Sequence, residues 1–337
     1  MESVRGQRFQ DIVDVSVALI AYHGDQWLPD CLNTLAQAST DQPHLVLLDN
    51  AGNTILGDLD LSAFDAEVLS TPRPMGFAEA NNFALVEASH LEDTVLFLNQ
   101  DTISPAGWID ECIHVLEEHP RLGAVSPCIR TYEDDGWDPS FLACLSEEQE
   151  AALKVGALSE EVTITQNAPA PALFVRTDVL MKTGPFDPVY GSYYEDYDLC
   201  RRIREEGYQI GVCRDVRIRH FSGGSTTTEQ QERRRTRQVI RNRVLYELRE
   251  GDEPRWPAAL NWFLRDFPYR LARGLVGTPS SQPPAVTLKA YGDLLQLGRR
   301  VFSSSYDEAR WHEYLADLEW PPSRHNVPAP SEEAPAA

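Results

Sequence analysis

The stretch of sequence that decides the fold spans residues 95–102 and reads V-L-F-L-N-Q-D-T. Its four apolar residues run without interruption and end at Asn99 and Asp101. A short apolar run bounded by polar residues is typical of a strand buried on both faces of a parallel sheet. In open α/β sheets, ligands collect beyond the carboxyl ends of such strands. The stretch therefore predicts a ligand site directly after a central strand.

Asn99 and Asp101 are two positions apart, so their side chains can face the same side of an extended turn. Carboxylate and amide oxygens are suitable ligands for Mg²⁺ or Mn²⁺ that carries the phosphates of a substrate. The alternative is that Asp101 caps a following helix, because Asp is strongly favoured at helix starts. This stretch alone leaves both roles open.

The segments on either side alternate between strand and helix patterns. Apolar runs predict strands at residues 13–21, 45–48, 67–70, 94–98, 124–129, 172–175, 210–212 and 216–218, and helical spacing predicts helices at 27–38, 78–89, 108–119, 177–183, 198–206, 233–249, 256–275 and 286–302. Repeated strand-loop-helix units indicate the α/β class, with a Rossmann-like, mostly parallel sheet flanked by helices. Residues 131–159 are acidic and weakly patterned, which predicts an irregular excursion.

The composition is that of a soluble globular protein. Of 337 residues, 42% are hydrophobic and 24% charged, and no apolar run reaches the length of a membrane span. Residues 1–14 contain no signal-peptide core. The six cysteines include no C-x-x-C pair, which favours reduced thiols in a cytoplasmic protein.

The net charge of −22 is unevenly distributed along the chain. Residues 1–200 carry −26 and residues 201–337 carry +4. The acidic front half argues against nucleic acid as a partner, whereas arginines clustered at 233–243 can meet a diphosphate or an anionic membrane surface. Three lysines stand against 27 arginines. Many acidic residues with few lysines suggest a protein from a salt-rich cytoplasm. The alternative is a GC-biased coding sequence, which favours arginine over lysine.

The pattern predicts four parts: an N-terminal extension at 1–12, a catalytic domain at 13–250, a helical region at 251–319 and a disordered tail at 320–337. Within the helical region, residues 255–275 interleave aromatic residues with arginines. Such a helix suits an interfacial membrane anchor. A helix packed on the catalytic domain is the alternative.

Three further groups of polar residues are candidates for chemistry. Asp49 and Asn50 end a strand, where a carboxylate can bind a base or ribose, or form a turn. Residues 76–82 read G-F-A-E-A-N-N, in which Asn81 and Asn82 tether a ligand or a loop. The alternative is that they are buried amides bonded to the backbone.

The third group lies at residues 192–202, S-Y-Y-E-D-Y-D-L-C-R-R. Glu195, Asp196 and Asp198 stand at the head of a helix, where the dipole stabilises carboxylates and where one can act as a general base. His220 follows a strand and precedes a Gly-Gly-Ser loop, which suits a metal or phosphate ligand as well as a structural histidine.

Taken together, the chain resembles the family 2 glycosyltransferases of the GT-A fold, especially the rhamnosyltransferase-like branch. The matching stretches are V-S-V-A-L-I-A-Y, V-L-L-D-N-A, G-F-A-E-A-N-N, L-F-L-N-Q-D-T, Y-E-D-Y-D-L-C-R-R, H-F-S-G-G-S and R-N-R, which cover residues 13–245 in the family's order. Two positions depart from the family pattern. His23 stands where Asn is frequent, and P-A-P-A-L at 169–173 replaces a Gly-Ala pair, where Pro171 removes a backbone donor.

The resemblance implies a role for each matching residue. Asp196 would be the catalytic base, with Glu195 beside it. Asp101 and His220 would hold Mg²⁺ or Mn²⁺, and Asp198 and Tyr194 would meet the acceptor. The donor nucleotide and its diphosphate would contact Ala21, Tyr22, Asp49, Asn50, Gly76, Asn81, Asn99, Arg241 and Arg243.

The implied reaction is inverting transfer of a sugar from a nucleoside-diphosphate donor, dTDP-rhamnose or a UDP-sugar, to a glycan or lipid-linked glycan hydroxyl in cell-surface polysaccharide synthesis. We expect a cytoplasmic enzyme, peripheral at the inner face of the plasma membrane through 255–275. A nucleotidyltransferase or NAD-type dehydrogenase is disfavoured because Y-H-G-D-Q-W replaces G-x-G-x-x-G after the first strand. An inactive sugar-nucleotide-binding or scaffold protein would be expected to lack Asp101, Asp196 or His220, and all three are present.

Overall fold

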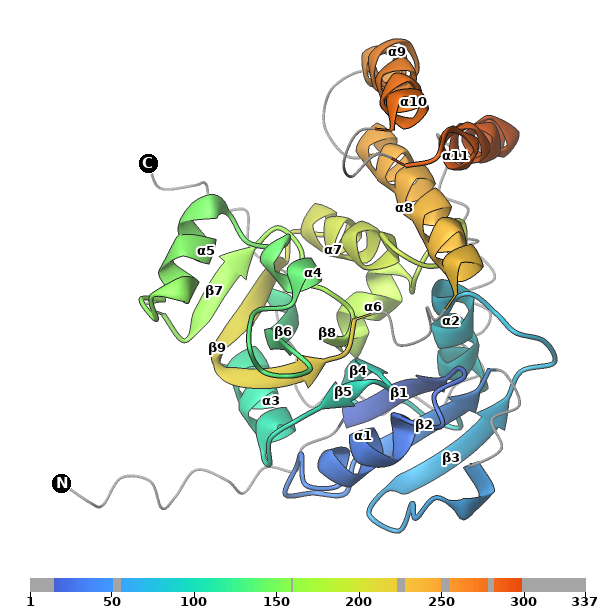
Figure 1. The fold of residues 1–337 in the computed structure, drawn as a ribbon. Coiled ribbons are helices and arrows are strands. Elements are labelled where there is room, and N and C mark those ends of the chain that lie inside the picture. Colours follow the sequence, from blue (N-terminus) through green and yellow to red (C-terminus); the bar gives the residue numbers. More distant parts are fainter. Residues whose placement is uncertain are drawn as a thin grey trace.

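A central sheet organises the computed structural model, which describes residues 15–50, 56–158, 160–222, 228–249, 255–277 and 282–298 (Figure 1). Its strands are β1 (Val15–Ala21), β2 (His44–Asp49), β3 (Asp65–Ser70), β4 (Thr94–Asn99), β5 (Thr102–Ile103), β6 (Leu122–Thr131), β7 (Val162–Thr165), β8 (Ala172–Arg176) and β9 (Gln209–His220). Their order across the sheet is β3-β2-β1-β4-β8-β6-β9-β5, with β7 paired to β9. The predicted Rossmann-like sheet is confirmed.

The direction of the strands explains where a ligand can bind. β1, β2, β3 and β4 are parallel neighbours, so their carboxyl ends meet at one edge. β8 is antiparallel to both β4 and β6. The parallel run is therefore interrupted directly beside β4, and crevices of α/β sheets form at such changes in topology.

Helices cover both faces of the sheet (Figure 1). They are α1 (Leu28–Leu35), α2 (Phe77–Glu87), α3 (Trp108–Glu118), α4 (Pro139–Leu142), α5 (Glu147–Lys154), α6 (Thr177–Thr183) and α7 (Glu195–Glu205). The next helix, α8 (Glu229–Arg249), extends away from the sheet (Figure 1). One core cluster joins alternate β1 residues, including Val17 and Leu19, to α1 and α3. The other joins Ala18 to α2, α6 and α7. This alternation follows from the two-residue period of a strand.

The C-terminal helices pack on α8. They are α9 (Arg255–Asn261), a π-helical turn at Trp262–Asp266, α10 (Phe267–Val276) and α11 (Pro284–Leu297). Trp262 and Tyr291 share an apolar cluster with Val244 and Leu245 of α8. None of the helices in the described ranges is long and apolar enough to cross a bilayer.

Several sequence predictions need correction. The segment 131–159 is predicted to be irregular, but its described residues, 131–158, include α4 and α5. Helix α5 begins with a capping box formed by Ser146 and Gln149. The helix predicted at 198–206 begins at Glu195, and the strands predicted at 210–212 and 216–218 form the single strand β9. The helix predicted at 256–275 is divided by the π-helical turn. The predicted parts at 1–12 and 320–337 lie outside the described residues.

Candidate active site

The site is built where β4 ends and the chain turns into β5. Thr102 of β5 pairs with His220 at the end of β9, which carries the histidine to the residues that follow β4. His220 Nε2 lies 3.4 Å from an Asp101 carboxylate oxygen and 3.3 Å from Asn99 Nδ2. Residues predicted from two separate motifs, Asn99 and Asp101 from one and His220 from the other, therefore meet at one point.

Asp138 holds the other nitrogen of the His220 ring, and sequence reasoning did not identify it. Its carboxylate lies 3.1 Å from His220 Nδ1 and also accepts a hydrogen bond from the hydroxyl of Ser222. The Asp138 side chain is fully buried and caps the start of α4. The Asp-Pro pair at residues 138–139 is a sequence signal for a helix start. The contact of Asp138 with His220 could not be predicted from it, because the two residues are far apart in the chain.

The electrostatics of this group follow from burial and from paired charges. Burial lowers the pKa of His220, but the carboxylates of Asp101 and Asp138 outweigh burial and raise that pKa to about 9. Burial raises the pKa of Asp138, and His220, Ser140 and Ser222 reverse that effect and hold it well below its usual range. The carboxylate of Asp138 thus stays ionised and fixes the orientation of the imidazole.

The predicted donor residues at the ends of β1 and β2 lie beside this group. Ala21 is opposite Asp49, and Ile20 is opposite Asn99, in the parallel register. Gln100 fixes the turn after β1, because its side-chain amide accepts from Tyr22 N at 2.9 Å and donates to Tyr22 O at 2.8 Å. Gln100 was missed in the sequence, where it stands unmarked between Asn99 and Asp101.

The remaining predicted donor residues of this half shape loops. Asn50 is buried and bonds both the N–H and the carbonyl of Met75, at 2.8 and 3.0 Å. Gly76 starts α2 so close to Gly191 that an added Cβ would lie 3.0 Å from its carbonyl oxygen. Asn81 is buried and donates to Phe77 O within α2. Asn50 thus tethers the loop at Met75, whereas Asn81 is a buried amide bonded to the backbone of its own helix. A direct contact of these residues with the nucleotide stays a prediction.

The carboxylate pair lies at the first turn of α7. Asp196 accepts a hydrogen bond from Ala170 N at 3.2 Å, and the carbonyl of Pro171 accepts one from Asn99 N at 2.9 Å. Pro171, which departs from the family pattern, has no backbone N–H to donate, but its carbonyl accepts a hydrogen bond at this position. Pro171 and Ala170 therefore connect Asn99, at the end of β4, to Asp196 through backbone hydrogen bonds. The candidate metal ligands and the candidate base are thus parts of one site.

Burial governs the acidity of this pair. It raises the pKa of Asp196 to about 6, against the opposing hydrogen bonds from backbone N–H groups. It raises the pKa of Glu195 well above its usual value, and the adjacent Asp196 raises it further. Glu195 Oε2 is buried without a hydrogen-bond partner among the described residues. The pair can therefore hold one proton and present one carboxylate at neutral pH.

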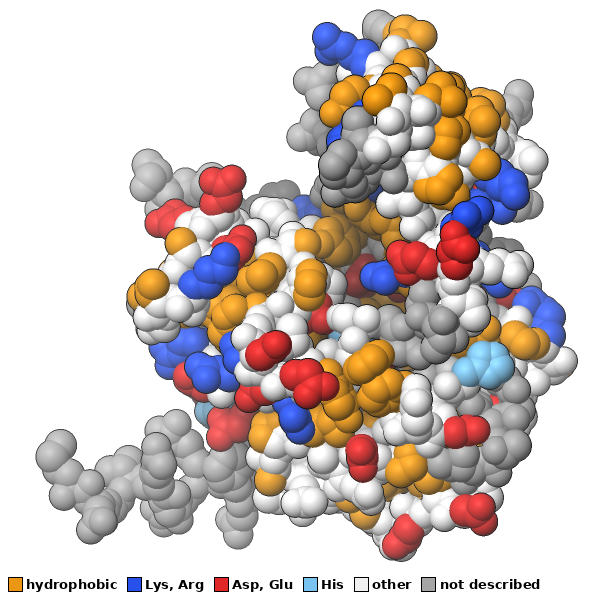
Figure 2. Space-filling view, viewed as in Figure 1, with side chains coloured by type: hydrophobic (Ala, Val, Ile, Leu, Met, Phe, Trp, Pro, Cys, Tyr) orange, Lys and Arg blue, Asp and Glu red, His pale blue; other side chains and the backbone are white. Residues whose placement is uncertain are grey.

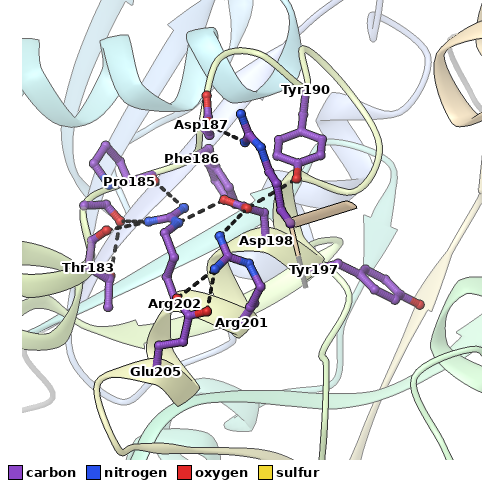
Figure 3. A network of polar contacts seen from close by, with 12 residues as sticks. Thr183, Pro185, Phe186, Asp187, Tyr190, Tyr197, Asp198, Arg201, Arg202 and Glu205 are labelled. Carbon is purple, nitrogen blue, oxygen red and sulfur yellow. Dashed lines mark hydrogen bonds and ion pairs between the residues drawn. The ribbon is translucent and has the colours of Figure 1, made fainter. Parts of the chain in front are cut away.

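Asp198 lies in a network of polar contacts with Arg201 and Arg202 (Figure 3). Its side chain is 1% exposed, and its two oxygens lie 2.9 Å from Arg201 and from Arg202. Arg202 also donates to the carbonyls of residues 183–185, which precede the loop to α7. This placement differs from the acceptor contact predicted for Asp198, since the carboxylate faces the interior and supports the loop.

The R-N-R motif of α8 holds the same loop from the other side. Arg241 donates to the carbonyls of Val189 and Tyr190 at 2.8 and 2.7 Å. Asn242 Nδ2 lies 2.6–2.8 Å from the carbonyl oxygens of residues 190, 192 and 193. Arg243 instead pairs with Glu247 on the same helix. The described contacts of both arginines are structural, and their approach to a diphosphate stays a prediction.

Tyr194 ends this loop immediately before α7. Its φ of +72° is in the left-handed region, and its ring lies 5.3 Å from Tyr197 and 5.8 Å from Tyr246. The side chain is half-buried, next to the carboxylate pair in the sequence. It is available to contact an acceptor, although no described contact assigns that role.

The fold and the sequence together define the class of this protein, a glycosyltransferase enzyme with the GT-A fold. Residues 14–240 match the model of the family described as glycosyltransferase like family 2, and the chain belongs to that family. The rhamnosyltransferase-like branch stays a prediction. A comparison with curated protein sequences gave no match.

Solved structures with the same fold include three glycosyltransferases. TarS 1–349 of S. aureus in complex with UDP-GlcNAc has a TM-score of 0.54 and 17% identity, covering 90% of this chain and 87% of its own. The mannosyltransferase PcManGT of Pyrobaculum calidifontis with GDP-Man and Mn²⁺ has a TM-score of 0.52 and 18% identity, covering 90% and 86%. GalNAc-T7 with UDP, GalNAc and Mn²⁺ has a TM-score of 0.54 and 13% identity, and the match spans 88% of this chain and 59% of that protein. At these identities the likeness shows the fold alone.

Proposed function

We propose that this enzyme is an inverting, divalent-metal-dependent glycosyltransferase that moves a sugar from a nucleoside diphosphate to a hydroxyl of a glycan or lipid-linked glycan. The observation that carries the proposal is the connection between two groups. Asp101 and His220 form one group, and Asp196 is joined to it through Ala170 and Pro171. A charge-stabilising centre and a base are the two elements that such a transfer requires.

The donor set fits a divalent ion. Asp101 and His220 offer a carboxylate oxygen and an imidazole nitrogen 3.4 Å apart, a separation suitable for neighbouring ligands of one ion. Asp138 orients the imidazole from its far side, as metal-bound histidines require. We propose Mg²⁺ or Mn²⁺ here. When bound, the ion stabilises the negative charge that develops on the departing nucleoside diphosphate.

In the proposed reaction, Asp196 accepts the proton of the acceptor hydroxyl. The hydroxyl oxygen forms a bond to the anomeric carbon while the bond from that carbon to the diphosphate oxygen breaks, and the nucleoside diphosphate leaves with the electron pair. Attack from the face opposite the leaving group inverts the anomeric centre. A base with a pKa of about 6 is mostly ionised at neutral pH and still accepts a proton in the transition state.

We propose dTDP-rhamnose or a UDP-sugar as donor, bound at the ends of β1 and β2 by Ala21, Tyr22 and Asp49. Calorimetric titration with UDP and with dTDP, each with and without Mn²⁺, tests this. We expect metal-dependent binding of one nucleotide, lost in Asp101→Ala and retained in Asp58→Ala, an exposed control. Binding that is indifferent to metal and to Asp101 would overturn the metal assignment and favour the scaffold alternative.

A membrane contact of the C-terminal helices is the second part of the proposal. Leu260, Leu264 and Val276 recur at multiples of four positions and are 47–78% exposed. Tyr269 and Leu275, 60% and 72% exposed, widen this apolar stripe. Figure 2 shows hydrophobic side chains gathered over this part of the molecule. An exposed apolar stripe beside arginines suits the surface of an anionic bilayer, where a lipid-linked acceptor would lie.

Vesicle flotation tests this contact. We expect the protein to float with vesicles that contain anionic lipid, and the variant Leu264→Asp/Leu275→Asp to stay at the bottom of the gradient. Val155→Asp is the matched control, because Val155 is 77% exposed but lies after α5. Equal flotation of all three proteins would show that the stripe has another role.

A further inference from the structure

A second cluster of metal-binding side chains lies at the amino ends of β2 and β3, away from the strand ends that form the active site. His44 begins β2, Glu67 is on β3, and His90 lies between α2 and β4. His44 Nε2 is 2.9 Å from Glu67 Oε1, and His90 Nδ1 is 4.0 Å from the same oxygen. One ligand atom from each residue lies within 4.8 Å of the others.

The strand pairing creates this cluster. His44 is opposite Asp65 in the parallel register of β2 and β3, and Glu67 is two residues further on the same face of β3. His90 reaches the cluster because its ring stacks on that of His44, with centroids 3.9 Å apart. Three residues that the sequence separates by more than twenty positions thus converge.

Each histidine is held at its other nitrogen by a separate group. Ser16 Oγ lies 2.9 Å from His44 Nδ1, and it also accepts a hydrogen bond from Glu92 N at 2.9 Å. A Glu92 carboxylate oxygen lies 3.3 Å from His90 Nε2. Hydroxyl and carboxylate partners of this kind fix the ring orientation of metal-bound histidines and leave the opposite nitrogen for the metal. The two remaining nitrogens, His44 Nε2 and His90 Nδ1, are those nearest to Glu67. His90 Nδ1 also lies 3.1 Å from Ser89 Oγ, a contact that a bound ion would replace.

Burial differs across the cluster in a way that suits binding from solvent. The His44 side chain is 2% exposed, so one ligand is rigid. His90 and Glu67 are 32% and 24% exposed, so the other two are open to an entering ion. Burial raises the pKa of Glu67, but hydrogen bonds from Ser89 and His44 outweigh it and lower that pKa, which keeps the carboxylate ionised.

We propose that His44, Glu67 and His90 bind a borderline divalent cation of the Zn²⁺ class, with water as the fourth ligand. Two imidazoles and one carboxylate favour Zn²⁺ over Mg²⁺ or Ca²⁺, and bond lengths of about 2.0–2.2 Å place neighbouring tetrahedral ligands about 3.3 Å apart. The ring stack has to open for both nitrogens to point at one ion, and the partly exposed His90 ring is the one that turns. The ion would join β2, the edge strand β3 and the segment before β4.

Zinc titration in a background without the active-site carboxylate tests the proposal. We compare full-length Asp101→Ala with Asp101→Ala/His90→Ala, and use Asp101→Ala/His119→Ala, which alters an exposed histidine, as the matched control. We expect the His90 variant to bind Zn²⁺ at least about 100-fold more weakly and the His119 control to bind it unchanged. Equal affinity in all three proteins, or no binding to Asp101→Ala, would overturn the site.

A second measurement needs no substitution and so does not depend on variants that fold. Crystals of the wild-type protein soaked in zinc are measured on both sides of the zinc absorption edge. An anomalous peak about 2 Å from His44 Nε2 supports the site. Zinc peaks at other positions only, with none at His44, would contradict it. Neither readout depends on nucleotide binding, so the outcome is independent of the proposed transferase reaction.

Discussion

The two ends of the sheet carry similar side chains with different surroundings. At the carboxyl ends, His220 lies between Asp101 and Asp138, and at the amino ends His44 lies between Glu67 and Ser16. Both histidines have one nitrogen held by the fold and the other directed at a carboxylate. Ligand chemistry alone therefore does not distinguish a catalytic centre from a structural one.

The difference lies in what adjoins each histidine. Next to His220, the backbone leads through Pro171 and Ala170 to a carboxylate whose pKa is raised to about 6. Next to His44, the neighbours are another histidine and paired carboxylates, which bind the proposed cation or orient its ligands. We therefore propose proton transfer together with ligand binding for the carboxyl end, and cation binding for the amino end.

The largest effect is expected for Asp196→Asn. The amide keeps the shape of the carboxylate but cannot accept the proton, so kcat should fall by about 10²–10⁴-fold. Nucleotide affinity should be unchanged, because Asp196 does not belong to the proposed metal ligands. Steady-state kinetics and calorimetry measure the two quantities, and Glu205→Gln, on the exposed end of the same helix, is the control. A parallel loss of affinity and rate would place Asp196 in donor binding.

The next effect is expected for Asp138→Asn. Removing the charge leaves the His220 ring without its ionised partner, so affinity for the nucleotide in the presence of Mn²⁺ should fall by about 10–100-fold. Asp135→Asn, an exposed residue nearby in the chain, should leave it unchanged. If Asp138→Asn bound the nucleotide with wild-type affinity in the presence of Mn²⁺, the contact from Asp138 to His220 would not be needed for binding. The similar surroundings of His220 and His44 would then not imply a similar role.

The pH dependence of the wild-type rate should show one acidic limb. Because burial raises the pKa of Asp196 to about 6, the base becomes protonated and inactive as the pH falls through that value. The rate should decrease about tenfold per pH unit below this point and stay level from pH 7 to 8. Measurement of kcat between pH 5 and 8 checks this, and a flat profile would exclude a titrating base in the rate-limiting step.

Sequence reasoning assigned Asn99, Asp101 and His220 to one candidate site because residues of these types stand at strand ends in a recognisable order, and the structure brings the three together. Asn99 and Asp101 follow an apolar run, and His220 follows another, so the sheet alone places them close together. The same reasoning could not identify Asp138, since its partner lies 82 positions away and its own segment seemed unpatterned. The Ser146–Gln149 capping box was visible there and was overlooked.

The roles of carboxylates in the same first turn of a helix are the hardest to assign from the sequence. Glu195, Asp196 and Asp198 have the same chemistry, but rotation about α7 turns Asp198 toward Arg201 and Arg202 in the interior. Which carboxylate faces the substrate depends on the packing of the helix, and single-sequence patterns do not contain that information. The His44 cluster was missed for a similar reason, since only the register of β2 and β3 forms it.

A smaller effect, on stability, is expected for Asn242→Ala. The buried amide lies within hydrogen-bonding distance of three carbonyls of the loop that carries the carboxylate pair. Its loss should lower the free energy of unfolding by about 1–3 kcal/mol, because carbonyl groups lose buried partners. Chemical denaturation measures this, with Asn33→Ala on the surface of α1 as control. An unchanged midpoint would mean that Arg241 holds the loop unaided.

The smallest effect is expected for Ser16→Ala at the amino end. The substitution removes the partner of Glu92 N and of His44 Nδ1, both 2.9 Å from the hydroxyl. It should lower the free energy of unfolding by about 1 kcal/mol and lower Tm by a few degrees. It should leave kcat unchanged, since β1 meets the active site only at its other end. Asp138→Asn should show the reverse pattern, with a loss of function greater than the loss of stability. If Ser16→Ala weakened nucleotide binding in the presence of Mn²⁺ as strongly as Asp138→Asn, the two ends of the sheet would be coupled through β1, and their proposed functions would not be separate.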